Sequence, residues 1–179
     1  MRSYYLIRCF LAILIGMSNL VAVAQQGNPL PIVHQKMQAL KWLSGKWEGP
    51  AYLLGQDGRR QEVNHHLAFE PQLGGTMFLI NENVMVAEDT LFRNLAFFGY
   101  DVLHSQYNLH AFTNGGVQMS AYVEVLDNKM IWRFHSSGHI YRYTAHLNTQ
   151  SQWHQVGEVS SDEGKSWVLF LESTLSRVK

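Results

Sequence analysis

The sequence predicts an all-β protein, a closed antiparallel up-and-down barrel of about ten strands, with one short N-terminal helix at a barrel mouth. From Lys46 onward, short aromatic and β-branched runs alternate with brief turn sequences rich in Gly, Asn, Asp and Ser. Connections this short place neighbouring strands antiparallel to one another. An open sheet of so many strands would leave two unpaired edges, and closure into a barrel removes both.

The first part of the chain, residues 1–24, has the features of a signal peptide. Arg2 and Arg8 give it a positive start, residues 10–17 are an apolar core, and Ala22-Val23-Ala24 fits the small-residue cleavage site. The apolar core is shorter than the roughly 20 residues that a membrane-spanning helix needs. We therefore expect an exported protein, periplasmic or extracellular; an N-terminal anchor that is never cleaved is the alternative.

The composition of the remaining chain excludes several classes of protein. Cys9 is the only cysteine and lies within the predicted signal peptide, so no disulfide or thiolate ligand is expected in the exported part. Residues 25–179 carry 12 Lys and Arg against 14 Asp and Glu, with no basic stripe, which argues against a nucleic-acid partner. No second apolar run is long enough for a membrane span. The sequence indicates no particular oligomeric state.

A flexible leader over residues 25–32 and a single β-barrel domain over residues 33–179 are predicted next. The domain begins with a short amphipathic helix over residues 33–43, which we place across a barrel mouth. Its apolar residues recur at helical spacing and are Val33, Met37, Leu40 and Leu43.

Ten strands are predicted after the helix, each bounded by a turn signal. Their ranges are 46–54, 60–69, 76–85, 91–101, 106–113, 117–125, 129–135, 138–147, 151–159 and 166–176. At the entry to the first strand, Gly45 allows a close backbone approach, and the indole of Trp47 is expected to plug the barrel end. Apolar side chains occur on both faces of several strands, so the pattern does not decide which face points inward.

The last turn has the sequence Ser160-x-Asp162-x-Gly164-x-Ser166-Trp167, which fits the pattern known as an Asp-box. This pattern occurs once, without the repeat of about 40 residues that a β-propeller requires. We expect Asp162 to accept backbone N–H groups, Gly164 to take a positive φ, and Trp167 to pack over the turn.

These motifs together resemble an uncharacterised family of small bacterial proteins with calycin-like barrels, distantly related to nitrobindin, lipocalins and fatty-acid-binding proteins. The segments that carry the resemblance are Gly45-Lys46-Trp47-Glu48-Gly49, Phe98-Gly99-Tyr100-Asp101, the Asp-box turn and Leu171-Glu172-Ser173-Thr174-Leu175. The resemblance implies a barrel of roughly ten strands with an internal cavity. Nitrobindin-like proteins bind heme through a histidine near the last strand, where this chain reads Phe170-Leu171-Glu172.

Charged residues interrupt several of the predicted strands, namely Glu82, Glu124, Arg133, Arg142 and Glu172. A charge that points into a barrel needs a partner or a polar ligand, whereas one that points outward is simply solvated. One hypothesis pairs Arg142 or Arg133 with Glu172, or with a ligand carboxylate, inside the lumen. The candidate ligand-binding residues are therefore Trp47, Trp132, Arg133, Tyr141, Arg142, Trp167 and Glu172.

The histidines provide only a weak case for a metal or heme site. His135 and His139 flank one hairpin turn, but a zinc site needs three or four ligands. His154, on the predicted strand 151–159, is a third candidate. We predict no metal and no cofactor, with heme as the alternative.

No catalytic signature is present: the chain has no G-x-S-x-G, no H-E-x-x-H and no phosphate-binding loop. The favoured hypothesis is a barrel that binds a small apolar or amphipathic molecule in its lumen. The alternatives are a heme-binding or metal-binding barrel that uses histidines, and a structural or interaction module with a filled barrel. An enzyme ranks last.

Overall fold

The computed structural model describes residues 28–55 and 57–178. The predicted signal peptide, residues 1–24, lies outside these ranges, as do residues 25–27 of the predicted leader. No helix within the described residues has the length and apolar character that a membrane crossing requires.

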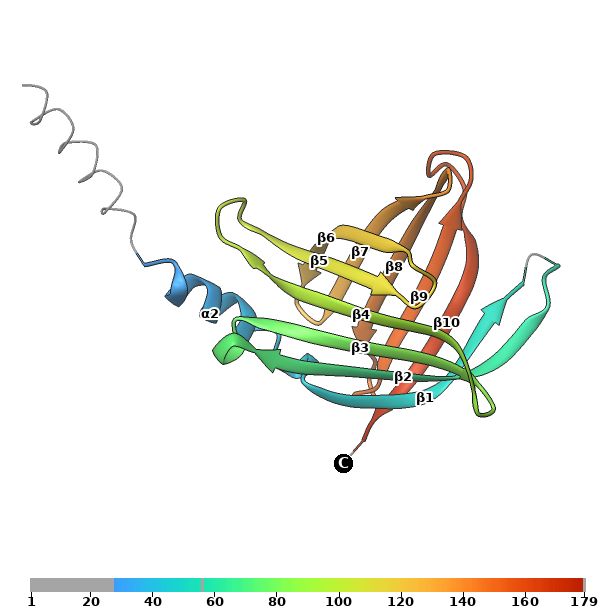
Figure 1. Cartoon of the computed structure of the whole chain (residues 1–179), viewed down its shortest axis with the longest axis horizontal. Coiled ribbons are helices and arrows are strands. Elements are labelled where there is room, and N and C mark those ends of the chain that lie inside the picture. The colour runs from blue at the N-terminus through green and yellow to red at the C-terminus, as the bar shows by residue number, and fades with distance from the viewer. Residues whose placement is uncertain (1–27, 56, 179) are drawn as a thin grey trace, which may run out of the picture. The chain divides into compact units, whose positions relative to one another are not determined.

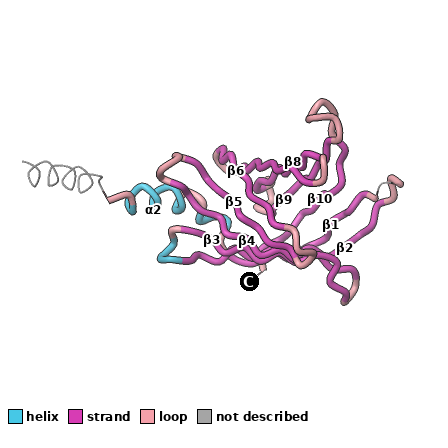
Figure 2. Tube along the Cα trace, turned by 45° about the horizontal axis from the view of Figure 1, so that its top comes forward, coloured by secondary structure: helices cyan, strands magenta, loops and turns pink. Residues whose placement is uncertain are grey.

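Ten antiparallel strands form one closed barrel in which each strand pairs with its neighbours in sequence, and β1 pairs with β10 (Figures 1 and 2). The strands are β1 (Gly45–Leu54), β2 (Arg60–Gln72), β3 (Met77–Val86), β4 (Asp89–Asp101), β5 (Gln106–Thr113), β6 (Gln118–Leu126), β7 (Lys129–Ser136), β8 (His139–Leu147), β9 (Trp153–Ser160) and β10 (Val168–Arg177). The predicted fold class and strand number are confirmed.

The strand ends differ from the prediction by up to three residues, and two of these differences have identifiable reasons. β2 continues to Gln72, because Pro71 pairs opposite Phe78 and needs no N–H donor of its own there. β10 starts at Val168, two residues late, because Ser166 is tied into the preceding turn by hydrogen bonds to Asp162.

The N-terminal helix α2 (Leu30–Gln38) begins inside the range predicted as leader and ends earlier than expected. A 3₁₀ turn, η1 (Lys41–Leu43), follows it, with the Leu43 N–H donating to Leu40 O over 2.9 Å. The predicted single helix over residues 33–43 is thus two helical pieces. The side chains of Met37, Leu40 and Leu43 are fully buried within the core of the barrel, as the amphipathic pattern predicts.

These three residues close one mouth of the barrel, which confirms the predicted position of the helical segment. They share a cluster with Trp47 at the start of β1 and Trp153 at the start of β9. The Trp47 Nε1–H donates to Leu43 O over 2.9 Å, so the indole that plugs the barrel end also holds the helical segment. The Tyr107 hydroxyl donates to Lys36 O over 3.1 Å and fixes the segment at a second point.

The seam between β1 and β10 completes the barrel. Arg177 at the end of β10 lies 4.1 Å over the Trp47 ring and donates to the carbonyl oxygens of Trp42 and Ser44. At Gly49 the two strands approach so closely that a Cβ would lie 2.5 Å from Thr174 O. Glycine is therefore required at this position for closure.

Candidate functional site

The lumen is not filled by side chains: it holds a cavity of about 660 Å³ to which all ten strands contribute. Its walls are mostly apolar, with Phe69, Ile80, Leu109, Val123 and Met130 among the residues that form them. Small-molecule sites in proteins have cavities of about 300 to 1,000 Å³, so the volume is sufficient for a ligand of that size.

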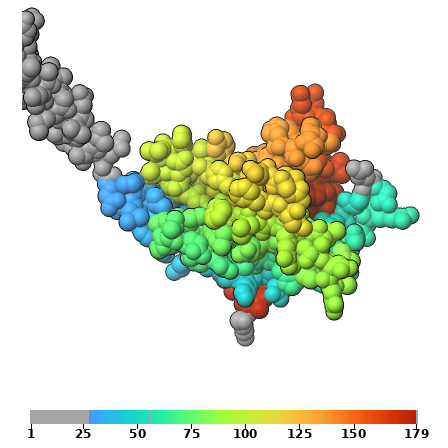
Figure 3. All heavy atoms as spheres, in the orientation of Figure 1, coloured from blue at the N-terminus to red at the C-terminus, as the bar shows by residue number. Residues whose placement is uncertain are grey.

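The cavity extends toward the barrel mouth that is opposite to the helical segment. Leu91 at the start of β4 and Val117 just before β6 line it there, and their side chains are about half exposed. Met119 of β6 lines the cavity slightly deeper. On the face seen in Figure 3, the residues of β3 to β6 form a continuous surface.

Stacked aromatic rings form one wall of the cavity. Trp132 of β7 stacks on Tyr143 of β8 with ring centroids 5.1 Å apart and an interplanar angle of 5°. Phe134 stacks on Tyr141 at 5.0 Å, and Phe170 of β10 packs edge-on against Tyr141 and Tyr143. A register shift between Leu169 and Leu171 accompanies the inward position of Phe170.

A polar cluster interrupts the apolar wall on the β2–β3–β4 side. Nε2 of His65 donates to Oε1 of Glu82 over 2.9 Å, and Nδ2 of Asn94 donates to Oε2 of the same carboxylate over 3.0 Å. The His65 side chain is fully buried, while 15% of the Glu82 side chain is exposed. Glu82 and Asn94 both line the cavity, so the carboxylate is presented to whatever occupies the lumen.

The electrostatic environment keeps this carboxylate charged. Burial acts to raise the pKa of Glu82, but the hydrogen bonds from His65 and Asn94 and the charge of His65 outweigh it, so the pKa lies below its usual value. Burial and the charge of Glu82 raise the pKa of Tyr143, which therefore remains a neutral phenol at physiological pH.

Three of the predicted ligand-binding residues lie on the inner side of the barrel. Trp132 lines the cavity directly, and Tyr141 belongs to the stacked aromatic wall behind it. Trp47 is 1% exposed and packs within the closed mouth, where it seals the barrel.

The other four lie on the outer side, contrary to the hypothesis of a charge pair within the lumen. Arg142 alternates with the inward-facing Tyr141 and Tyr143, and its guanidinium contacts Glu158 at 2.8 Å. It also lies 3.9 Å over the ring of Trp167, which packs on the outer turn. Arg133 is paired opposite Arg142, and Glu172 contacts Arg60 at 3.1 Å near the surface.

The candidate metal ligands do not come together. His139 lies at the start of β8 with its Nδ1 against Ser137 O, and His135 is exposed on β7. His154 lies beside His146 at the other end of β8, with ring centroids 5.3 Å apart. Within the described part of the chain, no group of three or more His, Cys, Asp or Glu side chains is placed to hold a metal ion.

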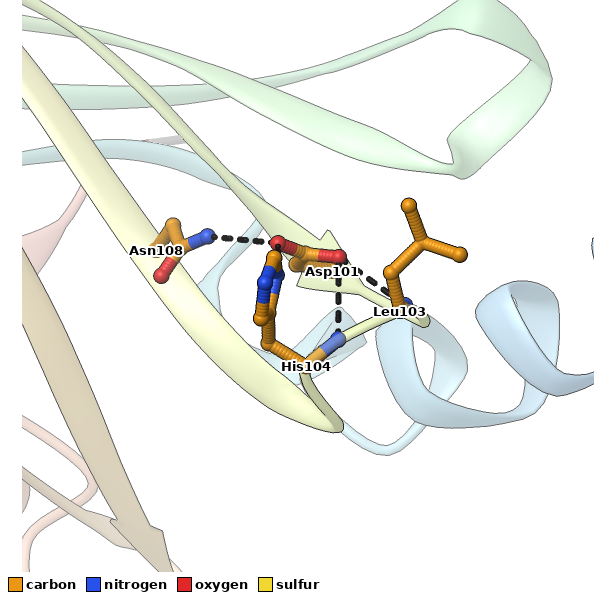
Figure 4. A network of polar contacts seen from close by, with 4 residues as sticks. All are labelled: Asp101, Leu103, His104 and Asn108. Carbon is orange, nitrogen blue, oxygen red and sulfur yellow. Dashed lines mark hydrogen bonds and ion pairs between the residues drawn. The ribbon is translucent and has the colours of Figure 1, made fainter.

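A second polar network lies at the β4–β5 turn, outside the cavity (Figure 4). The Asp101 carboxylate accepts from the backbone N–H groups of Leu103 and His104, from His104 Nδ1 at 2.7 Å and from Asn108 Nδ2 at 3.4 Å. The hydrogen bond from His104 makes the largest contribution to lowering the pKa of Asp101. Because every one of these contacts is local to the hairpin, the network stabilises the turn.

The turn before β10 has the hydrogen bonds that its sequence predicts. Asp162 accepts from Ser166 N at 2.8 Å and from Ser166 Oγ at 2.6 Å, Gly164 has a φ of 86°, and Trp167 Nε1 donates to Gly164 O. These hydrogen bonds, those from Ser166 first, lower the pKa of Asp162 to about 2.

This shift predicts a pH dependence of stability. An unfolded aspartate has a pKa of about 3.9, so the contribution of Asp162 is fully present above about pH 5 and is lost as the pH falls toward about 2. In urea unfolding, Asp162→Asn should lower the free energy of unfolding at pH 7, and the difference from wild type should shrink below pH 4. Asp89→Asn, at the exposed start of β4, is the control. A difference that is constant over this range would contradict the assignment.

Comparison with known proteins supports the fold. The crystal structure of Rv2717c from M. tuberculosis is similar to this chain, with a TM-score of 0.60 and 14% sequence identity, covering 80% of this chain and 97% of that one. At that identity the likeness shows the barrel fold alone. No family model matches the chain, and no curated protein matches it.

Proposed function

We propose that this protein binds a small, predominantly apolar molecule in the lumen of its barrel. The single observation that carries the proposal is the mostly apolar cavity of about 660 Å³ in the lumen, to which all ten strands contribute. An open apolar lumen keeps apolar surface in contact with water, so a ligand that covers this surface gains free energy on binding. The resemblance to calycin-like barrels agrees with this role, and the signal-peptide features favour export of the carrier.

A heme or metal site is a weaker candidate function than a carrier of apolar molecules, because of where the histidines lie. Among the described residues, His65 is the histidine whose side chain is fully enclosed, and its Nε2 is committed to Glu82. The open lumen likewise ranks a filled interaction module lower, although Leu95, Phe97 and Phe112 are exposed on the outside of β4 and β5.

Filling the cavity tests the proposal directly. Met119→Trp adds an indole at a position that lines the lumen near its open mouth. We expect a neutral fluorescent probe, N-phenyl-1-naphthylamine, to bind the wild type at micromolar concentration and to lose affinity by about tenfold or more in this variant.

Gln118→Trp is the matched control, because Gln118 precedes Met119 on β6 and points to the exposed side. It adds the same indole outside the barrel and should leave probe affinity unchanged. Equal loss in both variants, or no saturable probe binding by the wild type in titration and native mass spectrometry, would overturn the proposal.

A further inference from the structure

The charges around the lumen restrict which molecules it accepts. Among the described residues that line the cavity, Glu82 is the only one with a charged side chain; neither arginine nor lysine contributes to the walls. Arg142, the guanidinium that the sequence suggested for a ligand carboxylate, is held outside by Glu158 and Trp167.

The donors around the Glu82 carboxylate hold it in a fixed orientation. His65 Nε2 and Asn94 Nδ2 each give a hydrogen bond to one of its two oxygens, at 2.9 and 3.0 Å. His65 is 0% exposed, so it supports the carboxylate from behind and does not itself reach the cavity. A carboxylate accepts more than two hydrogen bonds, and the 15% of the Glu82 side chain that stays accessible faces an otherwise apolar space.

A ligand with a cationic head group would complete this arrangement. A charge that faces a low-dielectric cavity is stabilised by an opposite charge that also donates a hydrogen bond. An anionic ligand would instead meet a like charge, and among the described residues neither lysine nor arginine lines this cavity to receive it. The stacked rings of Trp132, Tyr143 and Phe134 would then enclose the apolar part of the molecule.

We propose that the lumen selects amphipathic amines, whose ammonium group binds the Glu82 carboxylate while the hydrocarbon part fills the aromatic-walled cavity. This inference rests on the proposed function, because it names the class of ligand for the same site. It assigns Glu82 as the specificity-determining residue, with His65 and Asn94 as residues that position it.

The experiment compares three probes with the same ten-carbon chain: decylammonium, 1-decanol and decanoate. Each is titrated against the wild type at pH 7 by displacement of N-phenyl-1-naphthylamine. We expect decylammonium to bind at least about tenfold more tightly than 1-decanol, and decanoate to bind more weakly than either. In Glu82→Gln, the preference for the amine should disappear, while the affinity for 1-decanol stays within about twofold.

Glu70→Gln is the control, since Glu70 is exposed on the outer side of β2 and its replacement changes the net charge equally. It should retain the full preference for the amine. If 1-decanol displaces the probe but decylammonium has no advantage in the wild type, the selectivity is refuted and the carrier function stands. If the probe binds but none of the three compounds displaces it, the selectivity is refuted and the carrier function stands. If the probe does not bind, both proposals fail. The wild-type comparison decides the matter even if Glu82→Gln does not fold.

Discussion

Replacing Trp47 with alanine is expected to lower the free energy of unfolding by about 4 kcal/mol, as for other fully buried tryptophans. The Trp47 side chain is 1% exposed and packs against Trp153, with ring centroids 6.4 Å apart. Its Nε1–H bond to Leu43 O holds η1 at the closed mouth, and Arg177 lies over its outer side. The substitution therefore removes packing, one hydrogen bond and the anchor of the helical segment together. Urea unfolding followed by circular dichroism measures the loss.

Trp132→Ala is the matched comparison, since it deletes the same side chain from the wall of the cavity. Trp132 is partly buried and already borders empty space on one side, so it makes fewer packing contacts. We expect a loss of about 2 kcal/mol for this variant. If Trp132→Ala destabilised the barrel as much as Trp47→Ala, the distinction between a sealing and a lining tryptophan would be wrong.

The barrel fold could be predicted from the sequence because the patterns that indicate it are local. Turn residues and alternation within each run depend on neighbours in the chain, and so does the helical spacing of Met37, Leu40 and Leu43. The sealing role of Trp47 also follows locally, from its place just after Gly45 at the start of the first strand.

The candidate site was harder to predict. Which face of each strand points into the lumen depends on how the whole sheet closes, and the sequence of a single strand does not show this. Tyr141 and Tyr143 alternate with Arg142, and either face of β8 is rich enough in apolar atoms to face inward. A signal for the polar cluster was nevertheless present. Glu82 stands in step with Phe78, Ile80 and Val84, all of which are buried, so period-two alternation places its carboxylate inside.

The same alternation locates the partners of Glu82. His65 stands between Val63 and Leu67 on the buried side of β2, and Asn94 precedes Ala96 on the inward side of β4. What the sequence does not contain is the register that sets Leu67 opposite Glu82 and Glu82 opposite Asn94. That register depends on turn geometry at both ends of each hairpin.

Breaking the His65–Glu82 pair on one side is expected to cost about 3 kcal/mol of stability. In His65→Leu, the Glu82 carboxylate keeps its position in the lumen wall but loses the donor at 2.9 Å, and the Asn94 amide alone remains beside the charge. A buried charge without its partner is costly, whereas an apolar pair of similar volume in the same place is tolerated. His65→Leu/Glu82→Leu should therefore recover most of the loss.

A double-mutant cycle on the free energy of unfolding measures this coupling, with the Arg142–Glu158 pair on the outer side as the reference. That pair is equally close, at 2.8 Å, but its side chains are 26% and 24% exposed. Water therefore solvates the remaining charge when one partner is removed. We expect a coupling energy of about 2 kcal/mol or more for the inner pair and about 1 kcal/mol or less for the outer one. If the inner coupling were no larger than the outer, the carboxylate would not be held in a low-dielectric site, and the charge selectivity inferred for the lumen would lose its physical basis.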